Sequence, residues 1–510
     1  MKQITGFLLG AACALAGCMP LSATNYYIDS ARGSDGNTGT APSSAWKSFA
    51  NLGGVTLVAG DSVLLRGGTS YAAPFEITGQ GRKRRPVVVG RWGNGADPRI
   101  VGDGSSQYAV RVFNSDWLVV QDLDITNRGS ARKGRRTGVK IECRDHGLSQ
   151  GVTVRRLTVH DVNGELTRDK GEGSGILVES VADKVPTAFD GLLIEDCVIS
   201  RCERNGINFR ANTDRRHWFP NRGVVIRGNL IDEVPGDGIV PIGCDGAVVE
   251  YNLMRNSPRT LTGREAAAGF WPGNCDNSIL RYNEVSDCKA PWDAQGFDAD
   301  FNCLNTTIEY NYSHDNEGGF LLVCNPGPGV YDMTGKLGNE GTVVRYNISV
   351  NDGLRPVPSR QGVYSPIIHV GGTSNNTEIS HNILHANANP VKGMDNCMIA
   401  SDSWGGFSDD TRYLSNVFYA AVPYTFRFSK STRDLFRGNY YIGEFSGRPD
   451  DSEGRYDSAW YRGLLAADPS GFKAVEPLLL TRKIANGRAE VRYVNPKAIK
   501  RFFRDMSRNN

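Results

Sequence analysis

The chain has 510 residues, enough for one large domain or several small ones, and it contains 60 glycines. Its hydrophobic fraction of 39% is low for a compact core but suits an elongated solenoid, in which each coil buries only a thin interior. The net charge of +3 is nearly balanced, so nothing in it points to nucleic acid, and we expect no such partner.

Residues 1–23 resemble an export signal, with Lys2 as the positive charge and an apolar run at 4–15 that is too short to span a bilayer. Two processing routes are open. Residues 15–18 (LAGC) look like a lipobox that would leave Cys18 lipidated, whereas 21–23 (LSA) would suit conventional cleavage. Either route predicts an exported protein, as an outer-membrane lipoprotein, a periplasmic protein or a secreted one. We expect a monomer.

Residues 24–100 are predicted to form an N-terminal cap and the first coils, because a first coil without a cap would expose an open sheet edge. Two basic clusters, 82–85 (RKRR) and 132–136 (RKGRR), are read as solvated loops. The alternative reading is a rim that attracts an acidic polymer.

Residues 101–445 contain an internal repeat. Each copy is a short alternating strand that ends in asparagine, and the clearest copies are 246–252 (GAVVEYN), 277–283 (NSILRYN), 305–311 (NTTIEYN) and 341–347 (GTVVRYN), with weaker ones at 223–229 and 376–382. Successive copies start between 23 residues (223 to 246) and 36 residues (305 to 341) apart. About 23 residues therefore make a minimal coil, and the excess is loop.

A second motif lies between these copies: glycine followed by isoleucine or phenylalanine. It occurs at Gly175-Ile176, Gly206-Ile207, Gly238-Ile239, Gly269-Phe270, Gly296-Phe297 and Gly319-Phe320. Each coil is thus predicted to have three short strands, the first starting at this glycine, the second ending in Tyr-Asn and the third following the asparagine. Stacked coils place equivalent strands side by side and parallel, about 4.8 Å apart.

Stacking predicts columns of identical side chains. The asparagines should form a hydrogen-bonded ladder of Asn229, Asn252, Asn283, Asn311, Asn347 and Asn382, with a column of tyrosines beside it. Nine of the 11 cysteines lie outside the signal, an odd number without CxxC spacing, which argues against a zinc site. Four of them, Cys244, Cys275, Cys303 and Cys324, are predicted to form a buried column at a turn.

This pattern resembles the pectate-lyase-like superfamily over roughly residues 100 to 445, and the asparagine ladder is the specific part of the resemblance. Residues 26–40 and 60–68 are similar to the capping segment of many secreted β-helix carbohydrate enzymes. The resemblance implies an all-β fold, a right-handed parallel β-helix with an N-terminal cap. Residues 446–510 lose the repeat and are expected to be a C-terminal cap and tail, with a short helix near 458–465 closing the end and a loose basic terminus.

In enzymes of this superfamily the substrate groove runs along the outside of the first strand. If the residue after each glycine points inward, the residues two and four after the glycine face the groove. Coil by coil, the outward pairs are Leu177 and Glu179, Asn208 and Arg210, Val240 and Ile242, Trp271 and Gly273, Asp298 and Asp300, and Leu321 and Val323.

Asp298 and Asp300 are two carboxylates on one outward face, and Trp271 occupies the column of Asp298 one coil earlier. A flat indole packs against a pyranose ring, and carboxylates about 6.5 to 7 Å apart overlap the separation used by inverting glycosidases. Asp293 and Glu317, in flanking loops, are further acid–base candidates. The predicted substrate-binding residues are Trp271, Arg210, Lys289, Trp292 and Asn208. His314 and Asp315 belong to the third strand and are read as structural.

Three functions remain open. The first is a glycoside hydrolase that acts on a polysaccharide through paired aspartates and needs no cofactor. The second is a polysaccharide lyase acting on a uronate polymer, with Lys289 or Arg210 as base and Ca²⁺ held by Asp293, Asp298 and Asp300. The third is a non-catalytic polysaccharide-binding surface protein. The discriminating feature is whether the acids converge on one point.

Overall fold

The computed structural model describes residues 23–327, 338–358, 362–363, 365–466 and 471–509. The predicted signal lies outside this part of the chain except for residue 23, and so does the candidate lipidation site Cys18. None of the helices in these ranges has both the length and the apolar character needed to cross a membrane.

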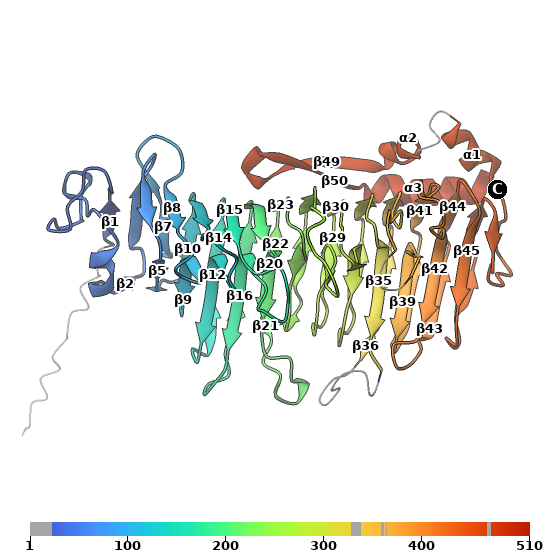
Figure 1. The fold of residues 1–510 in the computed structure, drawn as a ribbon, viewed down its shortest axis with the longest axis horizontal. Coiled ribbons are helices and arrows are strands. Elements are labelled where there is room, and N and C mark those ends of the chain that lie inside the picture. The colour runs from blue at the N-terminus through green and yellow to red at the C-terminus, as the bar shows by residue number, and fades with distance from the viewer. Residues whose placement is uncertain (1–22, 328–337, 359–361, 364, 467–470, 510) are drawn as a thin grey trace, which may run out of the picture.

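Parallel β-sheets run the length of the molecule (Figure 1). One sheet has 15 strands and a second has 13, and consecutive strands within each come from successive coils. In the 15-stranded sheet, for example, β26 (Val248–Glu250) lies between β22 (Val225–Arg227) and β29 (Ile279–Arg281), and both pairings are parallel. The arrangement is all-β and consistent with a right-handed β-helix.

The asparagine ladder is confirmed and is longer than the sequence suggested. From Asn229 onward, each side-chain amide donates to the side-chain oxygen of the next asparagine at 3.0–3.1 Å. The ladder continues through Asn416 and Asn439 and ends on the carboxylate of Asp451. The tyrosine column is also confirmed, because Tyr251, Tyr282, Tyr310 and Tyr346 stack in sequence with ring centroids 5.0–5.6 Å apart.

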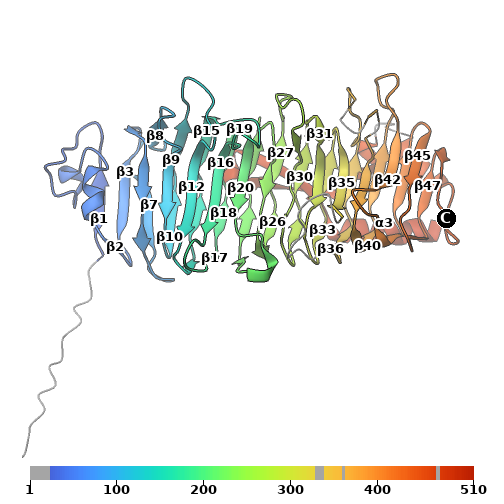
Figure 2. The ribbon, with the colours of Figure 1, turned by 60° about the horizontal axis from the view of Figure 1, so that its bottom comes forward.

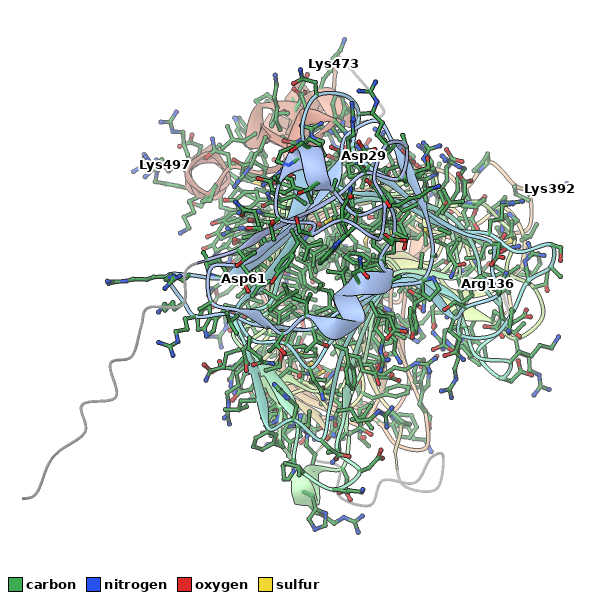
Figure 3. The ribbon with its side chains drawn as sticks, turned by 90° about the vertical axis from the view of Figure 1, so that its left-hand side faces the viewer. Asp29, Asp61, Arg136, Lys392, Lys473 and Lys497 are labelled. Carbon is green, nitrogen blue, oxygen red and sulfur yellow. The ribbon has the colours of Figure 1, made fainter. Side chains whose placement is uncertain are left out.

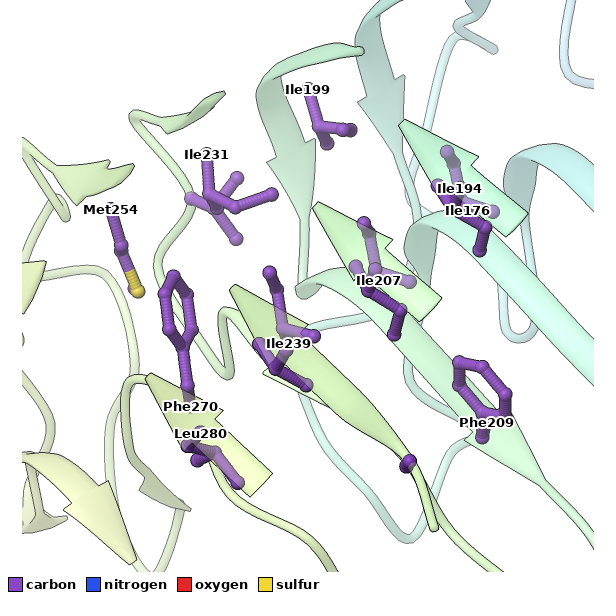
Figure 4. Packing of buried hydrophobic residues seen from close by; sticks show 14 of the residues in the cluster. Ile176, Ile194, Ile199, Ile207, Phe209, Ile231, Ile239, Met254, Phe270 and Leu280 are labelled. Atoms are coloured by element: carbon purple, nitrogen blue, oxygen red, sulfur yellow. The ribbon is translucent and has the colours of Figure 1, made fainter. Parts of the chain in front are cut away.

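The third face, which we call the groove sheet, carries the glycine–isoleucine motif. Figure 4 shows Ile176, Ile207, Ile239 and Phe270 as a row of inward side chains from successive coils, and all four are fully buried. Their register is as predicted, since Ile176 pairs with Ile207, Ile207 with Ile239, Ile239 with Phe270, and Phe270 with Phe297. The groove-facing columns therefore contain Asn208, Val240, Trp271 and Asp298 in one row, and Arg210, Ile242, Gly273 and Asp300 in the next.

The prediction was wrong for the coil that starts at Gly319. Asp298 pairs with Leu322, not with Leu321, so the outward residues of β35 (Gly319–Asn325) are Leu322 and Cys324, not Leu321 and Val323. Gly319 begins β35 with φ +118°, a conformation that few other residues adopt, and it pairs with Gln295 rather than Gly296, so this strand is offset by one residue from the repeat.

This shift also removes Cys324 from the cysteine column, which contains only Cys244, Cys275 and Cys303. In the next coil Asn339 takes the cysteine position, since Asp276 bridges Leu304 and Leu304 bridges Glu340. All nine cysteines of the described residues are buried free thiols.

The groove sheet is interrupted near its middle. One block of six strands ends at β24 (Ile239–Val240), and a second block of six begins at β32 (Gln295–Ala299). The coil between them contributes only isolated bridges through Phe270 and Gly273. Because the 15- and 13-stranded sheets continue past this point, the interruption opens one face without breaking the stack.

The C-terminal segment is neither loose nor confined to the end of the stack. After α1 (Ala459–Leu465), the antiparallel hairpin of β49 (Leu479–Ile484) and β50 (Ala489–Val494) and then α3 (Pro496–Asn509) lie along the side of the coils (Figure 1). We call this hairpin and helix the brace. In the end view of Figure 3, α3 with Lys497 lies on one side, whereas the loops with Arg136 and Lys392, which precede groove-sheet strands, project from the other.

The brace packs against the tyrosine column, and this contact buries the apolar residues of the brace. Tyr493 packs edge-on against Tyr251 and Tyr282, and Phe503 against Tyr346. Arg492 donates to the buried Glu284 at 2.8 Å, and Glu284 also contacts His314. His314 and Asp315 therefore belong to this contact, in agreement with their structural reading.

Replacing Arg492 by alanine should lower the free energy of unfolding by about 2 kcal/mol, because it leaves the buried Glu284 carboxylate with one partner fewer. The loss is smaller than for a fully buried pair because 35% of the Arg492 side chain is exposed. Thermal unfolding measures it, with Arg222→Ala, at an exposed arginine, as the control. Equal midpoints for the two variants would contradict the brace contact.

Candidate active site

A cavity of about 390 Å³ opens on the groove sheet at its interruption. In Figure 2 this part of the sheet lies between β16 (Ser174–Val181) and β20 (Asn205–Arg210) on one side and β31 (Trp292–Asp293) and β35 on the other. The walls carry charged and aromatic side chains, namely Arg168, Asp237, Arg264, Trp271, Trp292, Asp293, Asp298, Asp300, Phe301 and Trp404. This volume is within the range of small-molecule sites.

Three predicted acids, Asp293, Asp298 and Asp300, converge on the cavity. Asp298 comes from β32 and is only 3% exposed, whereas Asp300, just after that strand, and Asp293, from β31, are partly exposed. One carboxylate oxygen of Asp293 and one of Asp298 are buried without a hydrogen-bond partner among the described residues. Buried oxygens of this kind call for a bound hydroxyl or water.

The environment raises the pKa of all three carboxyls. Burial raises the pKa of Asp300 to about 7, against hydrogen bonds from the Cys324 thiol (3.1 Å) and the Phe301 backbone N–H (2.7 Å). Burial likewise raises the pKa of Asp293 to about 6, although Arg168 opposes the shift. For Asp298, burial and then the charges of Asp293 and Asp300 raise the pKa well above its ordinary value.

Asp237 is a fourth acid in the cavity, which the sequence reading missed. It is 2% exposed, and its carboxylate accepts hydrogen bonds from the Ala268 N–H and the Trp271 indole N–H (both 3.0 Å) and from Arg204 (2.9 Å). Burial would raise the pKa of Asp237, but the charges of Arg204 and Arg168 outweigh it and hold the pKa below its usual value. Asp237 is thus an ionised group whose carboxylate is fully engaged in hydrogen bonds, and one of these bonds orients the Trp271 ring. Its position between Gly236 and Gly238 was the available signal.

Trp404 is a second cavity residue that the sequence did not predict. It follows β42 (Cys397–Asp402), three strands along the groove sheet from β32, and folds back to the cavity wall. Gly371 makes room for it, because a Cβ at that position would come within 2.9 Å of the indole. Nothing in the repeat pattern marks Trp404, since its position depends on the path of a loop.

A second pocket of about 290 Å³ adjoins the first and shares Arg168, Asp237 and Trp271 with it. It contains two predicted substrate-binding residues, Asn208 and Arg210. Lys289 and Glu317 line neither pocket. Lys289 lies 4.0 Å from Asp287, and Glu317 is buried against Arg259. The structure therefore brings together seven of the nine predicted site residues and separates these two.

Among the described residues, no group of three or more histidine, cysteine, aspartate or glutamate side chains is arranged to hold a metal ion. That finding includes the set considered for Ca²⁺, Asp293, Asp298 and Asp300.

Comparison with known proteins gives two curated relatives. A lacto-N-biosidase of Bifidobacterium longum is 25% identical over an alignment that covers 79% of this chain, but the chain spans only 31% of that protein's length. A stretch covering 12% of the chain is 39% identical to part of alpha-1,3-galactosidase A of Akkermansia muciniphila, of which it covers 11%.

Among solved structures, a GH136 lacto-N-biosidase from Eubacterium ramulus superposes with a TM-score of 0.57 at 24% identity, covering 76% of this chain and 67% of that one. This likeness shows the fold. Residues 103–405, more than half of the chain, match the family described as the right-handed β-helix region. The chain therefore belongs to the right-handed β-helix family.

Proposed function

We propose that the protein is a glycoside hydrolase that cleaves glycosidic bonds of a polysaccharide. The observation that carries the proposal is the pair Asp293 and Asp300, two partly exposed carboxyls with raised pKa values that face one cavity beside Trp271 and Trp292. Acid–base cleavage of a glycoside needs such a pair. The similarity to a lacto-N-biosidase supports the same class of reaction.

We assign the reacting pair to Asp293 and Asp300 rather than to Asp298 and Asp300, because Asp298 is only 3% exposed whereas the other two are partly exposed. With a pKa of about 7, Asp300 is about half protonated at pH 7 and more so in slightly acidic solution, and it donates its proton to the leaving glycosidic oxygen. Asp293, with a pKa of about 6, is mainly ionised above pH 6 and supplies the base or nucleophile at the anomeric carbon. Burial and the charges of Asp293 and Asp300 raise the pKa of Asp298 well above its ordinary value, which sets it apart from the reacting pair.

The test is digestion of a panel of neutral and uronate polysaccharides, with and without EDTA, reading reducing ends and absorbance near 235 nm. New reducing ends without absorbance support hydrolysis. Absorbance near 235 nm would instead indicate a lyase, and binding without cleavage would indicate a polysaccharide-binding protein. Either of these outcomes overturns the proposal.

Cys324 tunes the proposed acid. Its thiol donates to Asp300 and lowers the pKa of that carboxyl, so Cys324→Ala should move the alkaline limb of the pH–rate profile upward by a few tenths of a unit or more. Cys324→Ser keeps a donor and should move the limb less. Cys303→Ala, in the cysteine column, is the matched control. An unchanged limb in Cys324→Ala would remove the thiol from this role.

We further propose that the chain is exported, with residues 1–23 as the signal and Cys18 as the site of an optional lipid anchor. Residues 24–100 are proposed as the N-terminal cap and the first coils. In support of this, β1 (Asn25–Ile28) pairs with β3 (Ser62–Arg66) at the end of the 15-stranded sheet. Metabolic labelling with palmitate, comparing the protein with its Cys18→Ala variant, distinguishes an anchored from a released product.

A further inference from the structure

A third cavity, of about 300 Å³, lies between α3 and the coils, and we call it the brace cleft. The coils contribute Tyr346, His381, Ser415, Gly438 and Tyr440 to its walls, and α3 contributes Lys500, Phe503, Arg504 and Ser507. None of these residues lines either pocket of the groove sheet. In Figure 3, α3 lies on the side of the stack away from the loops with Arg136 and Lys392. The brace cleft is therefore separate from the candidate active site.

The brace cleft is open because the tyrosine column tapers toward the C-terminal coils. The residue before each ladder asparagine is Tyr251, Tyr282, Tyr310 and Tyr346 in four successive coils, and then His381, Ser415 and Gly438. The backbone stays the same along the column, with φ between +52° and +58° from Tyr251 to Ser415. Only the side chains become smaller, so the space that a tyrosine ring fills in earlier coils remains as the cleft beneath α3.

His381 carries the last ring of this column. One face of the ring packs on Tyr346, with the centroids 5.1 Å apart, and Phe503 lies nearly perpendicular to it at 5.2 Å. Ser415 follows one coil further along, so no ring of the described chain stacks on the other face of His381. Burial lowers the pKa of His381, which leaves the ring neutral at neutral pH. A flat, neutral ring is a suitable surface for the apolar face of a sugar.

Two cations, Lys500 and Arg504, line the brace cleft, and none of the carboxylates that the structure describes does so. Neither cation forms an ion pair in that part of the chain, and Lys500 lies 5.4 Å from the centre of the Tyr346 ring. The carboxylates nearby have other partners: Glu378 accepts from the Ser380 hydroxyl, Asp451 ends the asparagine ladder, and Glu453 pairs with Arg437. The cleft therefore has a cationic rim on its α3 side.

The positive charge continues along the exposed face of α3. Its sequence spacing places five exposed cations on one face of the helix, Lys497, Lys500, Arg501, Arg504 and Arg508. Like charges four residues apart repel each other, so this stripe lowers the stability of the helix. It extends for about 16 Å along the helix axis. Residues 471–509 contain ten lysines and arginines and three acids, whereas the whole chain has a net charge of +3, so the rest of the chain is net negative.

A membrane surface fits the brace less well than a polymer does. Helices that lie in a membrane interface insert an apolar face into it. The apolar face of α3 is buried against the coils and α1 instead, through Ile499, Phe502, Phe503 and Met506. None of the exposed large apolar side chains in the described ranges belongs to α3. A concave cleft with a ring in its wall also suits a single sugar unit better than it suits a flat surface.

We propose that the brace cleft binds a sugar unit of an acidic polysaccharide. The sugar ring packs on His381, in the place that a tyrosine ring occupies in earlier coils, and its carboxylate or sulfate group contacts Lys500 and Arg504. The Ser415 and Ser507 hydroxyls offer partners for the sugar hydroxyls, and the polymer on either side follows the stripe of α3. This site lies apart from the groove sheet and does not depend on the proposed hydrolysis.

The experiment measures binding by titration calorimetry. The ligands are short oligosaccharides of polygalacturonate and of chondroitin sulfate, neutral oligosaccharides of dextran, and phosphatidylglycerol vesicles. At least one acidic oligosaccharide should bind about tenfold tighter than the dextran oligosaccharides. Which of the two does so identifies the anion as a carboxylate or a sulfate ester.

The decisive variant is Ser415→Tyr, which fills the brace cleft without changing the charge of the protein. It should weaken binding of the acidic oligosaccharide about tenfold. Its backbone suits the substitution, because the tyrosines at the same position of earlier coils have φ between +56° and +58°, close to the +52° of Ser415.

A second variant removes the charges of the cleft. Lys500→Gln combined with Arg504→Gln, both at exposed positions, should also weaken binding about tenfold. Lys83→Gln combined with Arg84→Gln removes the same charges from an exposed loop near the N-terminal end and is the matched control. The control should change the affinity less than about twofold. Thermal unfolding checks that each variant is folded, and the charge variant decides the matter if Ser415→Tyr is not.

Three outcomes would overturn the inference. Dextran oligosaccharides that bind as tightly as the acidic ones would remove the anion, and vesicles that bind where no acidic oligosaccharide does would make the brace a membrane contact. Equal losses in the charge variant and its control, or full affinity in a folded Ser415→Tyr protein, would place the binding outside the cleft. Digestion of polysaccharides without binding at the cleft removes only this inference, and binding at the cleft without digestion removes only the hydrolase.

Discussion

Replacing Asp300 by asparagine should nearly abolish hydrolysis while making the protein more stable. Asparagine has almost the shape of aspartate but cannot donate the proton that the leaving oxygen needs, so we expect kcat to fall roughly 1,000-fold. The release of reducing ends from the polysaccharide that the wild-type protein hydrolyses fastest measures this fall in kcat. A fall of less than tenfold would exclude Asp300 as the proton donor.

The gain in stability follows from the raised pKa of Asp300. Because its pKa is about 7 in the folded chain and 3.8 ordinarily, the folded state holds a proton that the unfolded state releases between these pH values. The wild-type protein therefore loses stability as pH rises from about 4 to about 7, and asparagine does not titrate. Above pH 7 the variant should gain on the order of 2–4 kcal/mol, and below pH 4 it should gain nothing.

Thermal midpoints measured at pH 4 and pH 7.5 test the sign of this effect. Asp190→Asn, at an exposed aspartate outside both pockets, is the matched control and should change neither activity nor the pH dependence. If Asp300→Asn were inactive and equally destabilised at both pH values, damage to the fold would explain the loss of activity instead.

Replacing Asn311 by alanine should cost about 4 kcal/mol of stability. The Asn311 side chain is fully buried and takes part in four hydrogen bonds: it accepts from the backbone N–H and side-chain amide of Asn283, and donates to the Leu280 carbonyl and to Asn347. Alanine leaves their buried partner groups unsatisfied, and each such group costs about 1–3 kcal/mol.

The matched control is Asn375→Ala, in β40 (Ser374–Ser380), where the side chain is exposed. It should change stability by less than about 0.5 kcal/mol. The midpoint of thermal or denaturant unfolding measures both variants. If Asn311→Ala were no more destabilised than Asn375→Ala, the ladder would not be a major source of stability.

The sequence was most informative where a residue type repeats in register. Asn229 to Asn382 recur because each must bond its counterpart in the next coil, and Ile176 to Phe297 recur because each fills the same layer of the core. This periodicity alone predicts that Trp271, Asp298 and Asp300 lie on the groove face, and the observed pairings agree.

Prediction failed where position depends on loops or on contacts between distant parts of the chain. Gly319 does start a strand, but it has a positive φ and pairs with Gln295 instead of Gly296, which shifts the register of that coil by one residue. Glu317 and Lys289 lay near Asp298 in sequence, yet the loop turns them to Arg259 and Asp287. Asp237 and Trp404 have no repeated counterpart: the glycines on either side of Asp237 are the one signal for it, and the position of Trp404 depends on the path of a loop.

The brace gives this molecule a property that stacked coils alone do not have. In a simple repeat protein each coil contacts only its neighbours, so segments can open independently from either end. Here the hairpin tip reaches Gly228 and, through Arg488, Thr158, which is 330 residues away in the sequence. Opening any coil between that point and the C-terminal end requires release of the brace. The central coils, which include both pockets, should therefore unfold as one cooperative unit and resist proteolysis together.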